Sequence, residues 1–357
     1  MPELSINSFL PNAREYLILT HQQAVPGWSP DADFELIPLP QGEYNMNFLV
    51  RQGETTWVLR INTGSQLGLT DQEQIAYEYN TLVLLQPMDV APIPYFLDNS
   101  FQVIPFGVLG MSFICGGPLD YHRDLPQAAR LMARYHQLKV PPDMIHLIRE
   151  ERPLSFIFER GVRKLDVYLS SELADPDLCT YLQEVIDWAD QARHQEVFFI
   201  QDPWQCIINS EVNSSNWIVD RRKVSIHLVD WEKPMWGDPS QDLSHFRVPT
   251  TTLWKTDIRL TAQDQVEMIR AYQAALHDRH LRDTIEERTR LRDPFNCLRG
   301  VSWCTMAWVQ YQRNQHRLKH PDTWRKLSMY VDLKFVRSIF DPIIHPGKTN
   351  LTIDRNC

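Results

Sequence analysis

Hydrophobic and polar positions alternate along the chain between residues 33 and 61. An alternation with a period of two is typical of β-strands that bury one face. The tripeptide Gln52-Gly53-Glu54 carries a turn signal within this segment, and the apolar stretch from Phe101 to Ile114 also predicts strands. The front third of the chain is therefore expected to be rich in β-structure.

One helix is expected between these strands. Thr70 and Glu73 have the spacing of a capping box, in which each side chain bonds to a free backbone N–H group at the start of a helix. We expect this helix to run to about Gln86, because Pro87 cannot continue it.

Helical periodicity dominates the remainder of the chain, beyond a break at Cys115-Gly116-Gly117-Pro118. Asp124-Leu125-Pro126 and Asp175-Pro176 are expected to start two helices. Four apolar stripes at helical spacing are Ala128, Leu131, Met132 and Tyr135; Leu178, Leu182, Val185 and Ala189; Val266, Ile269, Tyr272 and Leu276; and Cys297, Val301, Cys304, Trp308 and Tyr311.

This order of elements predicts an α+β fold with two lobes and a cleft between them. The expected divisions are an N-terminal extension over residues 1–32, a β-rich N-lobe over 33–114, a hinge over 115–119 and a larger, mostly helical C-lobe over 120–357.

Composition narrows the class of protein. A chain of 357 residues with 43% hydrophobic content can bury a full core. No apolar run reaches the roughly 18 residues of a membrane span, and the first residues lack the features of a signal peptide. The six cysteines are scattered without a CxxC pair, which favours reduced thiols in a cytoplasmic protein. A formal charge of −9 makes nucleic acid an improbable partner.

The segment from Asn209 to Trp231 carries the most informative residues. Glu211 stands five positions before Asn216, and Asp230 follows a predicted β-hairpin whose turn is Asp220-Arg221-Arg222-Lys223. Folding of the hairpin brings Asp230 beside Asn216, and their oxygens would suit Mg²⁺ together with phosphate oxygens and water. The alternative is a solvated loop followed by a strand-end cap.

A second pair of residues lies in the front third. Arg60 is a cation in the strand-like stretch 57–61, and Glu78 shares the apolar face of the following helix with Ile75 and Leu82. A buried carboxylate needs a partner, and Arg60 is the natural one. The pair could anchor nucleotide phosphates, as the equivalent pair does in kinases, or it could be a structural ion pair.

Two further segments supply candidates of a supporting kind. The turn from Gly42 to Asn47 contains Asn45 and one glycine, which permits a tight turn that could cover phosphates. Asp238 and Asp242, in Gly237-Asp238-Pro239-Ser240-Gln241-Asp242, could orient neighbouring loops or start a helix.

Taken in order, these segments resemble the aminoglycoside phosphotransferase and choline kinase-like family, which is related to the protein kinases. The resemblance covers roughly residues 33 to 250 and includes the linker Phe113-Ile114-Cys115-Gly116-Gly117-Pro118-Leu119, the segment Leu131-Met132-Ala133-Arg134-Tyr135-His136 and the segment Val229-Asp230-Trp231-Glu232.

The resemblance implies a bilobal protein-kinase-like fold that transfers the γ-phosphoryl group of ATP or GTP, with Mg²⁺, to a hydroxyl of a small-molecule acceptor. By position, Asn216 and Asp230 resemble the metal ligands, and Glu211 and Asn209 occupy the places of the catalytic Asp and its neighbouring His. Nucleotide-binding positions would be Gly42, Asn45, Arg60, Glu78 and Ile114, and supporting positions Asp238 and Asp242.

The substitutions at 209 and 211 leave two interpretations open. The loop could adjust so that Glu211 still accepts the hydrogen bond of the acceptor hydroxyl, which gives an active kinase. Alternatively, the chain could bind nucleotide without useful turnover and act as a nucleotide-binding or scaffolding protein, since a misplacement of about 1 Å can cost roughly 10²-fold in rate.

The acceptor is the least determined feature. Acidic and aromatic residues follow the predicted metal carboxylate closely and would suit an amine-bearing ligand, or they could pack the core. They are Trp231, Glu232, Trp236 and Asp238, and the same two possibilities hold for Trp303, Trp308 and Tyr311. The sequence does not determine the oligomeric state.

Overall fold

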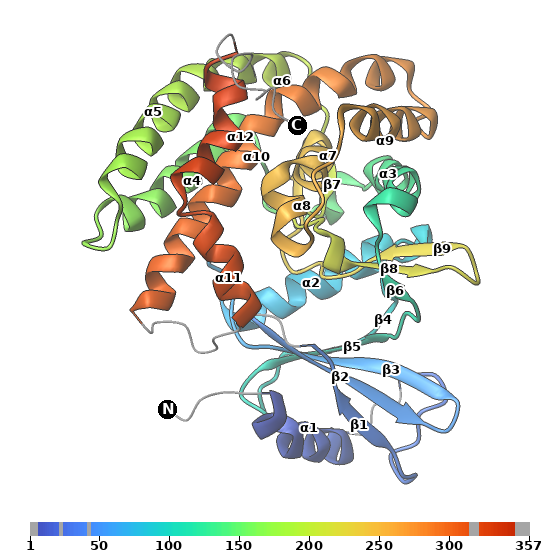
Figure 1. The fold of residues 1–357 in the computed structure, drawn as a ribbon. Coiled ribbons are helices and arrows are strands. Elements are labelled where there is room, and N and C mark those ends of the chain that lie inside the picture. The colour runs from blue at the N-terminus through green and yellow to red at the C-terminus, as the bar shows by residue number, and fades with distance from the viewer. Residues whose placement is uncertain (1–5, 21–23, 41–43, 314–320, 347–357) are drawn as a thin grey trace, which may run out of the picture. The chain divides into compact units, whose positions relative to one another are not determined.

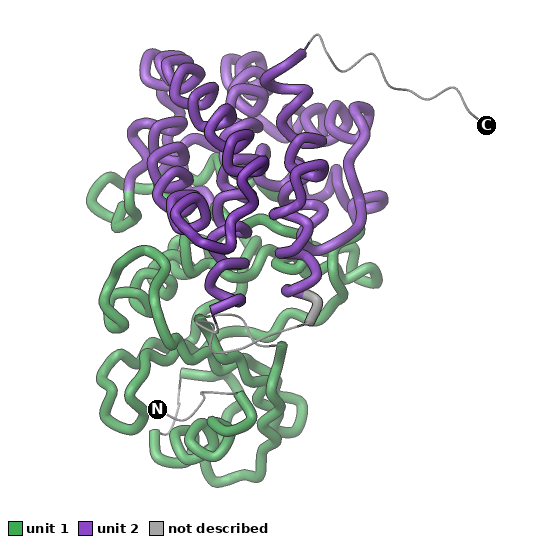
Figure 2. The backbone as a smooth tube through the Cα atoms, turned by 60° about the vertical axis from the view of Figure 1, so that its left-hand side comes forward, with its two compact units in different colours: residues 1–120, 130–148, 209–236 green, residues 121–129, 149–208, 237–357 purple. Residues whose placement is uncertain are grey.

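The structure is a computed structural model that describes residues 6–20, 24–40, 44–313 and 321–346. By their internal contacts, these residues form two compact units (Figure 2). Unit 1 comprises residues 1–120, 130–148 and 209–236, and unit 2 comprises residues 121–129, 149–208 and 237–357.

Unit 1 is built on an antiparallel five-stranded sheet with the strand order β1-β2-β3-β5-β4 (Figure 1). The strands are β1 (Glu35–Pro38), β2 (Asn45–Gln52), β3 (Thr55–Asn62), β4 (Pro94–Asp98) and β5 (Gly107–Ser112). The predicted turn joins β2 to β3, and Gly53 there has a φ of 56°, which glycine adopts without strain.

Two helices of unit 1 pack on this sheet: α1 (Ile6–Thr20) and α2 (Asp71–Leu85). One face of β3 presents Trp57, Leu59 and Ile61 to a core that also contains side chains of α1. Because side chains alternate along a strand, Val58, Arg60 and Asn62 point to the opposite face. The predicted capping box at the start of α2 is confirmed, with both hydrogen bonds between Thr70 and Glu73 present.

The prediction of strands over 101–114 is only partly correct. Residues 107–112 form β5, whereas residues 101–106 are not a strand, and β4 lies earlier, at Pro94–Asp98. The prolines before residue 101 made this stretch look irregular, but β4 is an edge strand, and an edge strand tolerates proline because one side of it needs no partner.

A smaller three-stranded sheet in unit 1 has the order β6-β8-β9. It consists of β6 (Gly117–Pro118), β8 (Trp217–Asp220) and β9 (Ser225–Leu228). The predicted hairpin is confirmed, because β8 pairs with β9 in antiparallel register, with Trp217 opposite Leu228.

Unit 2 is mostly helical, and α10 packs against α4 and α7 within it. Its elements are α4 (Pro153–Leu169), α5 (Pro176–Ala192), α6 (Val197–Gln201), β7 (Cys206–Ile208), α7 (Ser240–Arg247), α8 (Pro249–Lys255), α9 (Ala262–Ala274), α10 (Arg279–Gln312), α11 (Pro321–Met329) and α12 (Leu333–Ile344). Two further elements, α3 (Tyr121–His136) and β10 (Met235–Gly237), begin in one unit and end in the other.

Most of the predicted helical faces agree with the structure. Asp175 caps α5, and the α5 stripe is buried. Two details were wrong: α3 begins at Tyr121 instead of Asp124, and Val266 of α9 is 37% exposed while Met268 is buried. No helix in the described ranges is both long and apolar enough to cross a membrane.

Candidate active site

A polar surface on the sheet of unit 1 faces away from the core that contains α1. Asn45 and Asn47 of β2 lie opposite Asn62 and Arg60 of β3 in the strand register. Asn62 Nδ2 donates to Asn45 Oδ1 at 3.0 Å, and Arg60 Nη1 donates to Asn47 Oδ1 at 3.4 Å. The period-two alternation of both strands therefore gathers these polar side chains on one face.

Arg60 lies at the centre of this surface and bonds to carboxylates from two parts of the chain. Its Nε donates to Glu78 Oε2 of α2 at 2.9 Å, which confirms the predicted contact between the two residues. Its Nη2 donates to Asp230 Oδ1 at 2.6 Å and lies 3.6 Å from Glu232 Oε2. One guanidinium group thus serves three carboxylates.

The segment that carries Asp230 is held on α2 by three side chains from one face of the helix. Gln74 Nε2 donates to the carbonyl of Glu232 at 2.7 Å, and Tyr77 Oη donates to the carbonyl of Pro234 at 2.6 Å. Glu78 accepts from the backbone N–H of Trp231. The positions 74, 77 and 78 follow helical spacing, so a regular helix face aligns all three.

Asn209 joins the position of the predicted catalytic acid to that of the metal carboxylate. Its Oδ1 accepts from the backbone N–H of Glu211 at 3.0 Å, and its Nδ2 donates to the carbonyl of Asp230 at 3.2 Å. The side chain is fully buried. An amide side chain can donate one hydrogen bond and accept another at the same time. Asn209 therefore connects the two loops although it lacks the imidazole ring of the histidine that the family resemblance implies at this position.

Asn216 lies beside the same segment. The backbone N–H of Val229 donates to the Asn216 carbonyl at 2.8 Å, as the hairpin requires, and Asn216 Nδ2 donates to the carbonyl of Glu211 at 2.8 Å. Positions 211, 216 and 230 are therefore neighbours. Asp230 has a φ of 64°, in the left-handed region that non-glycine residues adopt uncommonly and aspartate more readily than most.

The carboxylate of Glu211 has a cationic partner that the sequence did not indicate. Glu211 Oε1 lies 2.9 Å from Lys233 Nζ. The Glu211 side chain is 28% exposed and that of Lys233 13% exposed, so the ion pair is partly withdrawn from solvent.

The site is more acidic than its cations can balance. Glu78, Asp230, Glu232 and Glu211 face only Arg60 and Lys233 in these contacts. Burial raises the pKa of Glu78 to about 6, although Arg60 opposes this shift. Burial and the charge of Asp230 raise the pKa of Glu232 to about 7. Burial lowers the pKa of Arg60, but its three carboxylates outweigh burial, so the net shift is upward.

The donor set at positions 216 and 230 fits a hard divalent cation. The Asp230 side chain is 33% exposed, and in the described part of the chain no hydrogen bond uses its Oδ2 or the Oδ1 of Asn216. Both free atoms are oxygens, which Mg²⁺ prefers. The described residues hold no cluster of three or more His, Cys, Asp or Glu that could bind a metal.

The other predicted site residues have different surroundings. Gly42 lies outside the described residues. Ile114 is half-buried in the segment between β5 and β6. Asp238 belongs to unit 2, where its Oδ1 accepts from the backbone N–H of Ser240 at 3.0 Å and its Oδ2 pairs with Arg288 at 2.5 Å. Asp242 is fully buried in the first turn of α7.

The tryptophans after Asp230 pack inside the protein. Trp231 is fully buried, donates from Nε1 to the Leu228 carbonyl at 2.8 Å and meets the ring of Tyr135 edge to face. Trp236 is 8% exposed. Of the two possibilities that the sequence left open for these rings, the structure favours core packing for both, and most clearly for Trp231, which has no exposed surface.

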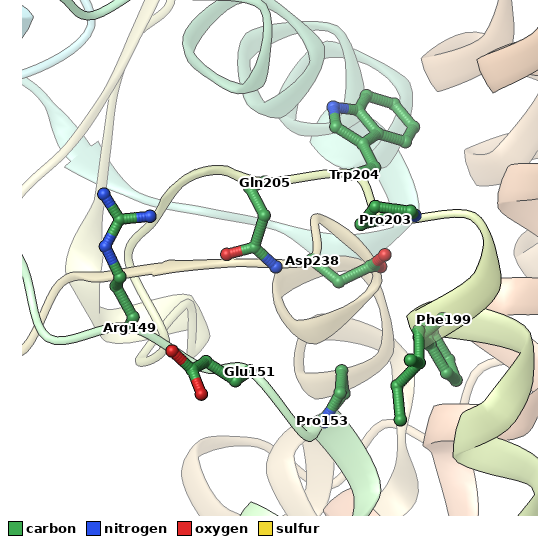
Figure 3. A pocket seen from close by; sticks show the side chains of 9 residues that line it. Arg149, Glu151, Pro153, Phe199, Pro203, Trp204, Gln205 and Asp238 are labelled. Atoms are coloured by element: carbon green, nitrogen blue, oxygen red, sulfur yellow. The ribbon is translucent and has the colours of Figure 1, made fainter. Parts of the chain in front are cut away.

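Unit 2 contains a cavity of about 240 Å³, with Asp238 in its wall (Figure 3). Phe199, Pro203 and Trp204 supply apolar surface, and Arg149 and Glu151 supply charged groups. Since both oxygens of the Asp238 carboxylate are already bonded within unit 2, this aspartate acts there as a structural group.

Sequence reasoning missed several contacts of the site. Asn45, one of the predicted nucleotide-binding residues, donates from Nδ2 to Glu232 Oε2. Gln66 Nε2 donates to the other oxygen of Glu232 at 3.1 Å. The position of Glu232, two residues after Asp230, was visible in the sequence, but nothing local indicated that its carboxylate would turn toward β2.

Comparison with known proteins identifies a family and a fold. The sequence profile of the phosphotransferase enzyme family matches residues 35–293. No curated protein sequence matches significantly.

Solved structures of similar fold include small-molecule kinases. A choline kinase from Cryptosporidium parvum is 13% identical, with a TM-score of 0.61 over 93% of this chain and 98% of that one. An ethanolamine kinase from Plasmodium vivax is 13% identical, with a TM-score of 0.62 over 91% and 89%. Spectinomycin phosphotransferase in complex with ADP and spectinomycin is 13% identical, with a TM-score of 0.57 over 86% and 93%. The fold is thus kinase-like, with a small antiparallel N-terminal sheet and a larger helical part.

Proposed function

Because this chain belongs to the phosphotransferase enzyme family, we propose that it is a Mg²⁺-dependent kinase that transfers the γ-phosphoryl group of ATP or GTP to a hydroxyl group of a small molecule. The observation that carries this proposal is the double hydrogen bond of Asn209. It ties the backbone of Glu211 to the backbone of Asp230, so the two residues that carry the carboxylates are neighbours, as phosphoryl transfer to a hydroxyl requires.

In the proposed reaction, the acceptor hydroxyl oxygen forms a bond to the γ-phosphorus. The bond from that phosphorus to the bridging oxygen breaks, and its electron pair leaves with the nucleoside diphosphate. Glu211 accepts the hydrogen bond of the hydroxyl group and then its proton, which passes to water. Positioning and electrostatic stabilisation supply most of the rate enhancement in phosphoryl transfer, so the exact basicity of Glu211 matters less than the position of its carboxylate.

Asn216 and Asp230 would hold the metal ion. The hydrogen bond from Asn216 Nδ2 to the Glu211 carbonyl fixes the side-chain amide, so its Oδ1 remains available as a ligand. When bound, Mg²⁺ neutralises charge on the phosphate oxygens. The excess of carboxylates over cations at the site favours the binding of such a cation.

Arg60 would take the place of the strand cation that anchors nucleotide phosphates in kinases. Its ion pair with Glu78 supports this role, because the pair orients the guanidinium group. Asn45 and Ile114 would lie along the nucleotide-binding surface, and Asp238 and Asp242 would support loops within unit 2.

We further infer that the acceptor carries an amino or ammonium group. The unbalanced acidic charge of the site favours a cationic ligand. The similar solved structures include a choline kinase, an ethanolamine kinase and a spectinomycin phosphotransferase, which point to the same class of acceptor.

The test is acceptor-dependent release of nucleoside diphosphate. Purified protein is incubated with Mg²⁺, ATP or GTP, and a panel of amino alcohols and aminoglycosides. We expect turnover with at least one acceptor and its loss in Glu211→Gln and Asp230→Asn. Asp33→Asn, a change of the same kind at an exposed aspartate of unit 1, should retain wild-type turnover. Equal background release in the wild type and both site variants would contradict the proposal.

A second candidate is a nucleotide-binding protein without useful turnover. The ion pair between Glu211 and Lys233 favours it, because a carboxylate that an ammonium group already holds is less available to the hydrogen bond of an acceptor hydroxyl. This candidate predicts that ATP raises the melting temperature, that Mg²⁺ adds little, and that no acceptor stimulates hydrolysis. Acceptor-dependent turnover that Glu211→Gln abolishes would eliminate it.

A further inference from the structure

Lys233 contacts the Glu211 loop at two points. Its Nζ lies 2.9 Å from Glu211 Oε1, and its backbone carbonyl accepts from Ser210 Oγ at 2.7 Å. Two consecutive residues of the loop therefore hold the backbone and the side chain of one lysine. Such a double contact fixes where the ammonium group lies relative to the carboxylate.

A third contact fixes the ammonium group from the other side. Lys233 Nζ donates to Gln66 Oε1 at 3.0 Å, and Gln66 Nε2 donates to Glu232 Oε1 at 3.1 Å. The Gln66 amide can satisfy both partners in only one orientation, with its oxygen toward the lysine and its nitrogen toward the carboxylate. Glu232 is in turn held by Asn45, so the ammonium group is tied to the polar face of the sheet.

We propose that Lys233 is a positioning residue that holds the Glu211 carboxylate where the acceptor hydroxyl must bind, and that Glu211 and Lys233 function as a matched pair. This inference rests on the proposed kinase function. Glu211 is one methylene longer than the aspartate that the family resemblance implies at this position, so its carboxylate can adopt more positions. The ion pair with Lys233 restricts these positions, because Lys233 is itself held by Gln66 through its ammonium group and by Ser210 through its backbone carbonyl.

The pairing has a consequence that a merely surface-exposed ion pair would not have. Shortening Glu211 to aspartate withdraws the carboxylate from Lys233, and a displacement of about 1 Å at a reacting group can cost roughly 10²-fold in rate. The substitution that restores the expected aspartate should therefore lower the turnover instead of raising it.

The experiment is a double-mutant cycle of Glu211→Asp and Lys233→Met, with Lys233→Arg as the conservative variant. We expect a kcat about 10²-fold lower for Glu211→Asp and at least about 10-fold lower for Lys233→Met. In the double variant, Lys233→Met should add less than about 2-fold, because its partner is already lost. The KM for nucleotide should stay within about 2-fold throughout, and Lys233→Arg should recover most of the kcat.

Lys139→Met serves as the matched control, because Lys139 is an exposed lysine of the same unit. It should retain the wild-type kcat, and melting temperatures measured for all variants identify any that fail to fold. A Glu211→Asp variant as fast as the wild type, or effects of the two substitutions that multiply independently, would overturn the inference and leave the kinase function standing. A wild type without turnover on any acceptor would overturn the kinase function and this inference with it.

Discussion

Both compact units bury arginine side chains against carboxylates, but the charges balance at Arg292 of unit 2 and do not balance at Arg60 of unit 1. In unit 2, Arg292 forms a bidentate pair with Glu150, with both N···O distances at 2.8 Å and neither side chain more than 1% exposed. In unit 1, Arg60 faces three carboxylates, and one of them, Asp230, is 33% exposed. A closed, balanced pair has no capacity for a ligand, whereas an open acidic excess can receive a cation.

The same contrast separates two aspartates that the sequence presented as similar candidates. Asp238 is buried, and both of its oxygens are bonded within unit 2, to Ser240 and Arg288. Asp230 keeps one oxygen without a hydrogen bond in the described ranges, in a backbone conformation with a φ of 64°. Saturated hydrogen bonding thus favours a structural role for Asp238, whereas the free oxygen and the left-handed backbone of Asp230 favour the functional role proposed for it.

The largest expected effect comes from opening the closed pair of unit 2. Arg292→Met should lower the free energy of unfolding by about 4 kcal/mol, because it leaves Glu150 buried without its partner. Urea unfolding measures the loss. The double variant Arg292→Met/Glu150→Gln should recover part of it, and a double variant less stable than Arg292→Met alone would contradict this account.

The next effect separates function from stability at the open site. Asp230→Asn should lower acceptor-dependent turnover by about 10² to 10³-fold, the usual loss for one electrostatic group at a reacting centre. Its free energy of unfolding should fall far less than that of Arg292→Met, since the side chain is partly solvated. If Asp230→Asn destabilises the protein as much as Arg292→Met does, the distinction between the two regions is wrong.

A smaller effect concerns the pH dependence of stability. Glu78 binds its proton up to about pH 6 in the folded protein, because burial raises its pKa above the ordinary value of 4.5. The unfolded chain releases that proton earlier, so between about pH 4.5 and 6 the stability falls as pH rises. Relative to Glu78→Gln, the wild type should lose about 2 kcal/mol over this window and little above it. Urea unfolding of both proteins at several pH values measures the difference in their free energies of unfolding. A wild type that gains stability relative to Glu78→Gln as the pH rises through this window would refute the assignment.

The smallest effect is expected at an exposed ion pair. Arg51 and Glu35 lie 3.3 Å apart with side chains 50% and 65% exposed. Arg51→Met should change the free energy of unfolding by about 0.5 kcal/mol or less, because solvent screens the pair. A change near that of Arg292→Met would mean that burial does not govern these contributions.

Local patterns were sufficient for much of this protein. The capping box at Thr70, the Asp175 cap and the hairpin between Trp217 and Leu228 depend on hydrogen bonds between residues close in sequence. The alternation along residues 57–62 likewise determines that Arg60 points away from the core that contains Trp57. Those interactions repeat with the period of the helix or strand, so they can be read without knowing how the elements pack.

Tertiary packing decided the remainder. The contacts of Arg60 with Asp230, of Asn45 with Glu232 and of Lys233 with Gln66 join residues 170, 187 and 167 positions apart. The sequence offered Trp231 and Glu232 equally to a ligand or to the core, and packing placed both inside. A buried polar or charged group must find a partner, and which partner it finds depends on the elements that fold against it. For that reason the proximity of Glu211, Asn216 and Asp230 in space could be predicted from the sequence, whereas the partners that hold their side chains could not.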